Sequence, residues 1–279
     1  MATTDLHFIA GALQPVKRGI RLLGGNVDDG VQIDASSVGI VVGNHTMGSF
    51  AAWIMVPDNT GTYCIWGTGD ANAVEYTTLD VEAGTIKMLM IKATPTTMID
   101  VNTPANSIKP HTWHHVCVVQ NADILEIYID GVVQVLTWTT ATTPGQWFAD
   151  LNNIDSGTIG AADSVAGGAL LTEEFAGYIA DVRLWSGTTS ASVLTQEQVK
   201  DVMSGKSVGA PYNAWTLNQN LLDTGTGADN GTADGDIIYS DACEFSSRLT
   251  FLETVPLAAN NVSIMADGGV GYAYTILAA

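Results

Sequence analysis

The sequence predicts an all-β fold: a one-domain, antiparallel jelly-roll β-sandwich with one short helix and terminal extensions. Apolar and polar residues alternate with a period of two, the apolar runs are short, and clusters of Gly, Asn, Asp and Thr separate them. Short strands at this spacing are typical of sandwiches and jelly rolls. The chain, at 279 residues, is long enough to bury one large core of this kind.

Strands are expected first where this alternation is clearest. Val31 and Ile33 alternate with polar neighbours, and residues 49–56 form an apolar run that stops at a Pro-Asp-Asn-Thr-Gly turn. Residues 63–66 and 86–92 are two further strand-like runs.

Two consecutive hairpins are expected near the middle of the chain. Residues 113–119 and 124–129 flank a short polar turn, and Asp130-Gly131 then leads into residues 132–136. Asp-Gly suits a type I′ turn, because both central residues of that turn need positive φ.

One helix is expected after residue 194. Thr195 and Gln198 form a capping-box pattern, apolar residues at 199, 202 and 203 share one face, and Gly205 ends the helix. The helix is short, so we expect it to decorate the β fold and to close one end of the sandwich.

Composition excludes several classes of protein. Asp and Glu number 29 against 10 Lys and Arg, which gives a net charge of −19, while 46% of the residues are apolar. The apolar content excludes intrinsic disorder, and an acidic body without a basic stripe argues against nucleic-acid binding. We expect no membrane insertion, since no apolar stretch reaches roughly 18 residues, and the N-terminus lacks the pattern of a secretory signal.

Charge divides the chain into three regions. Residues 1–21 carry +2 and are expected to form an N-terminal arm, residues 22–204 carry −15 and form the sandwich, and residues 205–279 carry −6. The third region is expected to complete the sandwich or to make interchain contacts. The candidate partner-binding residues of the arm are Lys17, Arg18 and Arg21.

Cysteine usage indicates thiols rather than disulfides. Cys64, Cys117 and Cys243 are odd in number, far apart and outside any Cys-x-x-Cys or Cys/His metal pattern. We therefore expect buried free thiols.

Motifs along residues 22–204 resemble the laminin G-like and pentraxin-like branch of the concanavalin A-like lectin/glucanase superfamily. The segments Thr112–Val119 and Leu125–Gly131 are similar to its W-x-H-V and L-x-x-Y-x-D-G strands. Further matches, in the family's order, are Gly30–Asp34, Ser49–Trp53, Thr158–Gly160 and Phe175–Trp185. The resemblance implies a jelly roll of this type.

The chain departs from the family's order at one place. Residues 222–232 resemble a D-x-x-G-x-x-N-G-T segment that usually precedes the first strands. Either the C-terminal side supplies the opening hairpin, as in a permuted sandwich, which we favour, or a second small β unit begins here.

No enzymatic activity is expected. Glycosidases of this superfamily cluster carboxylates on one strand, and a retaining mechanism needs two of them about 5 Å apart. Glu126 and Asp130 are the only strand pair that the sequence suggests, and Asp130 lies in a turn. His114 and His115 occupy a strand where the family carries a packing histidine, so a structural role is expected.

Calcium is the expected cofactor if there is one, since members of this branch bind it at the sandwich rim through Asp and Asn oxygens. The candidate ligands are Asp150, Asn152, Asn153 and Asp155. A second acidic loop holds Asp223, Asp229, Asn230, Asp234 and Asp236. For both loops the alternative is an Asx-rich turn that caps its own backbone.

Two tryptophans beside Thr- or Gly-rich loops, Trp138 and Trp147, are candidates for stacking on a sugar ring. Packing in the core or at a sheet edge is the alternative for each.

These features together predict a non-enzymatic structural protein of a viral (phage) particle, such as a capsid-decoration or fibre protein. It would be assembled in the host cytoplasm as a homo-oligomer, dock onto a capsid or tail, and bind surface glycans through its jelly roll. The alternative is a calcium-assisted carbohydrate-binding module of a secreted assembly or of the extracellular cell surface. A third class, a glycan hydrolase, is disfavoured by the missing carboxylate array.

Overall fold

The computed structural model describes residues 18–24, 29–33, 45–70, 74–92, 96–140, 145–151, 154, 156–162 and 173–239, and the backbone of 263–264 and 272–273. The chain divides into two compact units, Met1–Glu244 and Phe245–Ala279. In the second unit, β17 (Ser263–Ile264) pairs antiparallel with β18 (Tyr272–Ala273).

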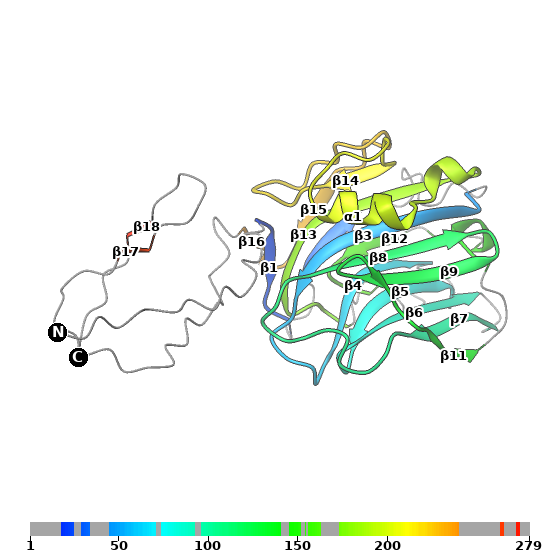
Figure 1. The fold of residues 1–279 in the computed structure, drawn as a ribbon, viewed down its shortest axis with the longest axis horizontal. Helices are drawn as coiled ribbons and strands as arrows, with labels where there is room; N and C mark the ends of the chain where they lie inside the picture. The colour runs from blue at the N-terminus through cyan, green and yellow to red at the C-terminus, as the bar shows by residue number, and fades with distance from the viewer. Residues whose placement is uncertain are drawn as a thin grey trace, which may run out of the picture. The chain divides into compact units, whose positions relative to one another are not determined.

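Two antiparallel sheets make up the first unit (Figure 1). The first sheet has the order β10-β9-β8-β3-β13-β1-β16, and β14 also pairs with β13. Its strands are β1 (Ile20–Leu22), β3 (Met47–Met55), β8 (His114–Asn121), β9 (Ile124–Ile129), β10 (Val132–Val133), β13 (Gly177–Gly187), β14 (Asn213–Trp215) and β16 (Ile238–Tyr239).

The second sheet has the order β11-β7-β6-β5-β4-β12-β2-β15. Its strands are β2 (Gly30–Ile33), β4 (Thr62–Gly69), β5 (Tyr76–Glu82), β6 (Thr85–Lys92), β7 (Thr96–Asn102), β11 (Thr137–Thr140), β12 (Ser156–Ile159) and β15 (Gly231–Asp234). The two sheets form a sandwich, which confirms the predicted antiparallel jelly roll.

The main core lies between the sheets and follows the alternation of the strands. In β3, Phe50 and Ile54 belong to the cluster between the sheets. Ala51 and Trp53, which point the other way, belong to smaller clusters on the outer side of the first sheet. Since successive side chains of a strand point to opposite faces, burial of one set fixes the direction of the other.

Local sequence signals place the two central hairpins as predicted. Asp130 and Gly131, between β9 and β10, have φ values of 52° and 74°, the positive pair that a type I′ turn requires. The predicted strand after this turn is shorter than expected, because β10 ends at Val133.

The expected helix is α1 (Gln196–Met203), and the predicted capping box begins it. Thr195 Oγ1 accepts the N–H of Gln198, while the side chain of Gln198 accepts the N–H of Thr195. Val199 and Val202 are buried against the outer side of the first sheet. Two short 3-10 helices, η2 (Phe148–Asp150) and η3 (Ser190–Ser192), complete the described helices. None of these helices is long and apolar enough to cross a membrane.

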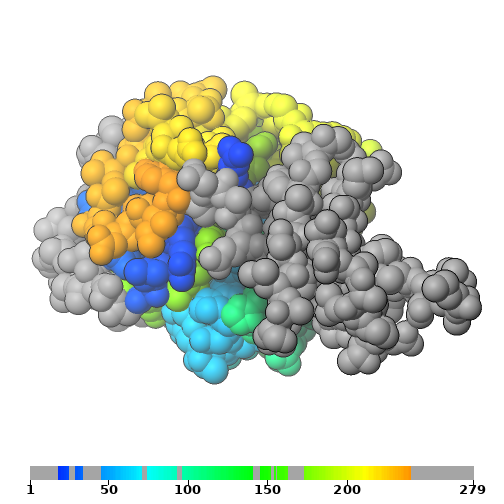
Figure 2. All heavy atoms as spheres, turned by 90° about the vertical axis from the view of Figure 1, so that its left-hand side faces the viewer, coloured from blue at the N-terminus to red at the C-terminus, as the bar shows by residue number. Residues whose placement is uncertain are grey.

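Residues 213–239 add strands to both sheets. In the first sheet, β14 pairs with β13 and β16 pairs with β1. In the second sheet, β15 pairs with β2. In Figure 2 the blue strand β1 lies beside the orange segment that includes β16. This is the arrangement expected if the C-terminal side supplies an opening part of the sandwich.

The predicted boundary of the N-terminal arm at residue 21 falls inside a strand. Residues 20–22 form β1, in which Ile20 is fully buried and Leu22 nearly so. The burial of two apolar side chains and pairing on both edges hold this segment in the sheet.

The second acidic loop uses its carboxylates for its own backbone, the alternative expected for Asx-rich turns. Asp223 Oδ1 accepts the N–H groups of Ala214 and Gly225, both at 2.7 Å. Its Oδ2 accepts the N–H of Asp229 at 2.8 Å and the side-chain amide of Asn213 at 2.7 Å. One carboxylate therefore holds the loop against β14.

We expect Asp223→Ala to lower the free energy of unfolding by about 3 kcal/mol, because it leaves several partly buried donors without an acceptor. Urea unfolding measures this change. Asp201→Ala is the control: Asp201 pairs with Lys206 on the surface, and its loss should cost less than about 1 kcal/mol. Equal effects of the two substitutions would contradict the role of Asp223.

Candidate functional site

The outer faces of the two sheets differ in character. Helix α1 packs on the outer face of the first sheet, where Val199 and Val202 contact an apolar cluster that includes Cys117 and Val119. The outer face of the second sheet instead carries a polar hollow of about 110 Å³. Its lining residues are Thr62, Tyr76, Thr78, Asp80, Glu82, Lys87, Leu89 and Glu173.

Strand alternation positions these side chains. Leu79 and Val81 of β5 lie in the core, so Thr78, Asp80 and Glu82 point outward. On β6, Ile86, Met88 and Met90 lie in the core, which turns the intervening residues to the same outer face. Asp80 and Lys87 are direct partners in the β5–β6 register.

Lys87 forms its ion pair diagonally rather than with its direct partner. Its Nζ lies 2.7 Å from Glu82 Oε2. The structure gives no salt bridge to Asp80 or Glu173 among the described residues. The described lining of the hollow therefore includes three carboxyl groups and one ammonium group, and that ammonium group is already paired with Glu82.

Asp80 is the most unusual group of the hollow. Only 3% of the residue is exposed. Its Oδ2 accepts the hydroxyl of Thr78 at 2.6 Å, whereas its Oδ1 is buried and receives no hydrogen bond from a nitrogen or oxygen donor of the described residues. The pKa of Asp80 is raised to about 7. Burial is the largest cause and the nearby charge of Glu173 adds to it, while the hydrogen bonds from the Thr78 hydroxyl and the Cys64 thiol and the charge of Lys87 act in the opposite direction.

Glu173 lies at the rim, in the segment ahead of β13. Burial raises its pKa, Lys87 opposes that rise, and Glu82 adds to it. Its φ of 55° is in the left-handed region, and its carbonyl accepts the N–H of Cys64 at 2.9 Å. This backbone bond fixes the segment against β4.

The predicted free thiols are confirmed for two cysteines. Cys64 and Cys117 are both buried and unpaired, and Cys243 lies outside the described residues. Burial raises the pKa of both thiols, and for Cys64 the charge of Asp80 contributes as well.

A carboxyl that titrates near neutral pH beside other carboxylates can bind cations and hydroxyl groups or exchange protons. Sites for whole small molecules usually measure roughly 300–1,000 Å³. A hollow of about 110 Å³ is well below that range, so it suits one functional group of a larger ligand. The geometry therefore favours anchoring a ligand over enclosing a scissile bond.

The carboxylate group of the hollow was not among the sites expected from the sequence. Glu126 and Asp130 were the only strand pair expected, but Asp80 and Glu82, which share the outer face of β5, come closer to the carboxylate array of a glycosidase. The alternation of Leu79 and Val81 with these two acids was the available signal. Glu173 could not be found in this way, because only folding brings it to β5.

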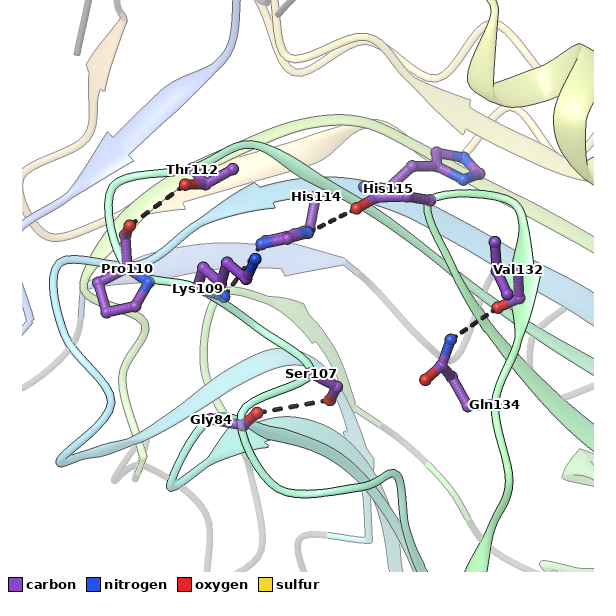
Figure 3. Close-up of polar contacts among 10 residues, drawn as sticks. Gly84, Ser107, Lys109, Pro110, Thr112, His114, His115, Val132 and Gln134 are labelled. Atoms are coloured by element: carbon purple, nitrogen blue, oxygen red, sulfur yellow. Dashed lines mark hydrogen bonds and ion pairs between the residues drawn. The ribbon is translucent and has the colours of Figure 1, made fainter. Parts of the chain in front are cut away.

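Asp130 and His114 have a structural role, as expected for the histidine. His114 Nε2 accepts the N–H of Lys109 at 3.0 Å (Figure 3). Nδ1 therefore carries the hydrogen, and it lies 2.8 Å from Asp130 Oδ2. Asp130 Oδ1 accepts the N–H of His115. Burial raises the pKa of Asp130, but the hydrogen bonds from His114 and His115 lower it overall.

Of the four predicted calcium ligands, the structure describes only Asp150. Its Oδ2 accepts the N–H of Trp147 at 2.9 Å and so caps η2, as in the backbone-capping alternative. Asn152, Asn153 and Asp155 lie outside the described residues. Among the residues that are described, no group of three or more His, Cys, Asp or Glu could hold a metal ion. The calcium site stays a prediction.

The prediction that Trp147 stacks on a sugar is wrong. Only 1% of this residue is exposed, and its Nε1 donates to Ser186 Oγ at 3.1 Å. Its ring lies in the main core beside Phe148. Trp138 is partly buried at the margin of the same core, opposite Val101 in the β11–β7 register, and its sugar stacking stays a prediction.

The structure describes two of the three predicted partner-binding cations. Arg18 and Arg21 are exposed, and Lys17 lies outside the described residues. Arg21 is paired across the strands with Tyr178, and its Cζ lies 5.8 Å from the centroid of that ring. This cation–π contact ties Arg21 to the sandwich itself.

Comparison with known proteins agrees with this architecture. The family model described as the concanavalin A-like lectin/glucanases superfamily matches residues 24–200. This confirms the resemblance inferred from the motifs. No match to a curated protein sequence was found.

Several solved structures are similar to this chain. A Bacteroides ovatus ATCC 8483 protein with a proposed role in carbohydrate binding is 16% identical, with a TM-score of 0.52 over 81% of this chain and 61% of that chain. The CBM40 of Ruminococcus gnavus IT-sialidase is 13% identical, with a TM-score of 0.48 over 67% and 97%. The heptameric SAP-like pentraxin of Limulus polyphemus is 17% identical, with a TM-score of 0.48 over 82% and 91%. At 16% identity the likeness to the Bacteroides ovatus protein concerns the fold alone.

The raised pKa of Asp80 makes stability depend on pH. A carboxyl whose pKa is higher in the folded state contributes stability below its unfolded pKa, and loses that contribution as pH rises through about 7. We expect the wild-type free energy of unfolding to fall more between pH 4 and pH 8 than that of Asp80→Asn, by up to ~4 kcal/mol. Urea unfolding at both pH values measures the difference; equal falls would contradict it.

Proposed function

Because this chain belongs to the concanavalin A-like lectin/glucanases superfamily, we propose that it is a non-catalytic glycan-binding protein whose ligand lies over the polar hollow on the outer face of the second sheet. The observation that carries the proposal is Asp80, a buried carboxyl whose hydrogen-bond donors among the described residues are the Thr78 hydroxyl and the weakly donating Cys64 thiol. An acceptor in that state costs free energy until a donor reaches it.

The lining of the hollow suits a sugar. Hydroxyl groups of Thr62, Thr78 and Tyr76 stand beside the carboxylates, so the hollow offers donors and acceptors together. A sugar hydroxyl can give its hydrogen to Asp80 and accept one from a neighbouring hydroxyl. Charge-assisted bonds to a carboxylate are stronger than neutral ones, which gives Asp80 the largest expected contribution.

The size of the hollow supports binding without hydrolysis. A glycosidase must hold the sugars on both sides of the bond that it cleaves, together with two carboxyl groups at a set separation. The hollow of about 110 Å³ offers room for one substituent of a ring. The rest of the ligand would lie along the outer faces of β4, β5 and β6.

A glycan array tests this proposal with the wild type, Asp80→Asn and Asp201→Asn. We expect hits for the wild type and for Asp201→Asn, whose carboxylate is on α1, and an affinity at least about tenfold lower for Asp80→Asn. An array without hits, or hits that Asp80→Asn retains in full, would contradict the proposal. Hits that a chelator removes would favour the calcium-assisted alternative.

A more specific proposal is that the protein is a homo-oligomeric component of a viral particle. A lectin-like jelly roll on a capsid or tail would tether the particle to glycan-bearing surfaces, and the cations near the N-terminus would contact the assembly. The alternative location is an extracellular surface. This part is supported by the sequence features alone.

Truncation tests the assembly role, and the structure sets where to cut. Deleting residues 1–21 would remove Ile20, which is fully buried. A loss of assembly could then result from misfolding and would not identify an assembly contact. We expect deletion of residues 1–17 combined with Arg18→Gln, which removes two of the three candidate cations and leaves β1 complete, to preserve the thermal unfolding midpoint and to abolish oligomerisation or incorporation into a particle. Unchanged assembly, measured by light scattering and co-sedimentation, would overturn the assembly role.

A further inference from the structure

We propose that the hollow binds a primary ammonium group, and that the protein therefore selects glycans with free amino groups over N-acetylated or anionic glycans. This inference rests on the proposed glycan-binding function and specifies its ligand class. Three observations carry it: the charge of the hollow, the state of Asp80 and the size of the space.

The charge of the hollow favours a cation. Asp80, Glu82 and Glu173 line it together with Lys87, whose Nζ is engaged by Glu82 at 2.7 Å. Asp80 and Glu173 form no salt bridge with a cation of the described residues. The whole chain carries −19, so a carboxylate-bearing sugar would meet repulsion both locally and at a distance.

The hydrogen-bonding needs of an ammonium group match what the hollow leaves unused. An ammonium group has three donors and no acceptor, whereas an N-acetyl group has one donor and adds bulk. Asp80 Oδ1 is buried and lacks a nitrogen or oxygen donor among the described residues, and Asp80 as a whole is 3% exposed. The Glu173 carboxylate and the hydroxyls of Thr62 and Tyr76 line the same space.

The volume of about 110 Å³ admits an amino group and the edge of its ring, and it excludes a buried sugar. N-acetylation would both remove the charge and enlarge the substituent. Selection would therefore come from an ion pair with a buried carboxylate and from steric exclusion. A ligand without the amine would leave Asp80 with only the Thr78 hydroxyl and the weak Cys64 thiol as donors, which would penalise its binding.

Protonation of Asp80 would weaken this binding below neutral pH. Among the described residues, the ionisable groups that interact with Asp80 are Cys64 on β4, Tyr76 on β5, Lys87 on β6 and Glu173 ahead of β13. Glu82 on β5 and Asp100 on β7 interact with Lys87. Glu173 favours the protonated form of Asp80, and Lys87 favours the ionised form. A bound ammonium adds a second cation and stabilises ionised Asp80.

Calorimetry on the full chain tests the inference with three probes. Two are a β-1,4-linked glucosamine tetrasaccharide and its N-acetylated counterpart. The third is Nα-acetyl-lysine amide, whose free ε-amino group represents the primary amine of a protein side chain. At pH 7 we expect the glucosamine tetrasaccharide to bind at least tenfold more tightly than the N-acetylated one. Asp80→Asn should remove this preference, and Asp201→Asn should keep it. Lys87→Met should strengthen binding of the glucosamine tetrasaccharide at least threefold, because it removes the competing cation and frees Glu82.

The outcomes separate this inference from the function on which it rests. Equal binding of both tetrasaccharides, with loss in Asp80→Asn, would overturn amine selection and leave glycan binding intact. Binding of neither tetrasaccharide would overturn amine selection, and the glycan array would then decide separately whether glycan binding stands. Binding of the lysine probe alone would overturn selection of amino sugars, because it would show that the hollow recognises protein amines. Weaker binding of the glucosamine tetrasaccharide by Lys87→Met, at an unchanged thermal unfolding midpoint, would also overturn it.

Discussion

Burial of one face of every central strand is the constraint on which this structure depends. Side chains such as Ile54, Leu79 and Met88 fill the space between the two sheets. Because a strand alternates, a shift of one residue in register would expose the apolar set and bury the polar set. The constraint that builds the core therefore also fixes which polar side chains reach the outer faces.

The two outer faces use this constraint differently. On the first sheet, α1 covers an apolar outer cluster and so extends the core. On the second sheet, β5 and β6 present Asp80, Glu82 and Lys87 outward, and the segment ahead of β13 adds Glu173. Asp80 is buried among these groups and forms no ion pair with a described residue, so its environment, and not its identity as an aspartate, raises its pKa.

Local signals were sufficient wherever neighbours in sequence decide the structure. Asp130-Gly131 predicts a type I′ turn because few other residue pairs accept positive φ twice, and Thr195 with Gln198 predicts the start of α1 through reciprocal capping. Trp147 was misjudged because its flanking Gly and Thr residues suggest an exposed loop, while burial depends on Phe148 and on Ser186, which is distant in sequence.

The sequence by itself determined the sandwich, its two central hairpins, its helix and its superfamily, because period-two alternation and turn chemistry are local properties of the chain. Only the tertiary structure decided where the candidate site lies. The lining of the hollow comes from β4, β5, β6 and residue 173, and the sandwich edges join β1 and β2 to strands after residue 230. Such meetings depend on the packing and pairing of strands far apart in sequence, which no pattern of neighbouring residues records.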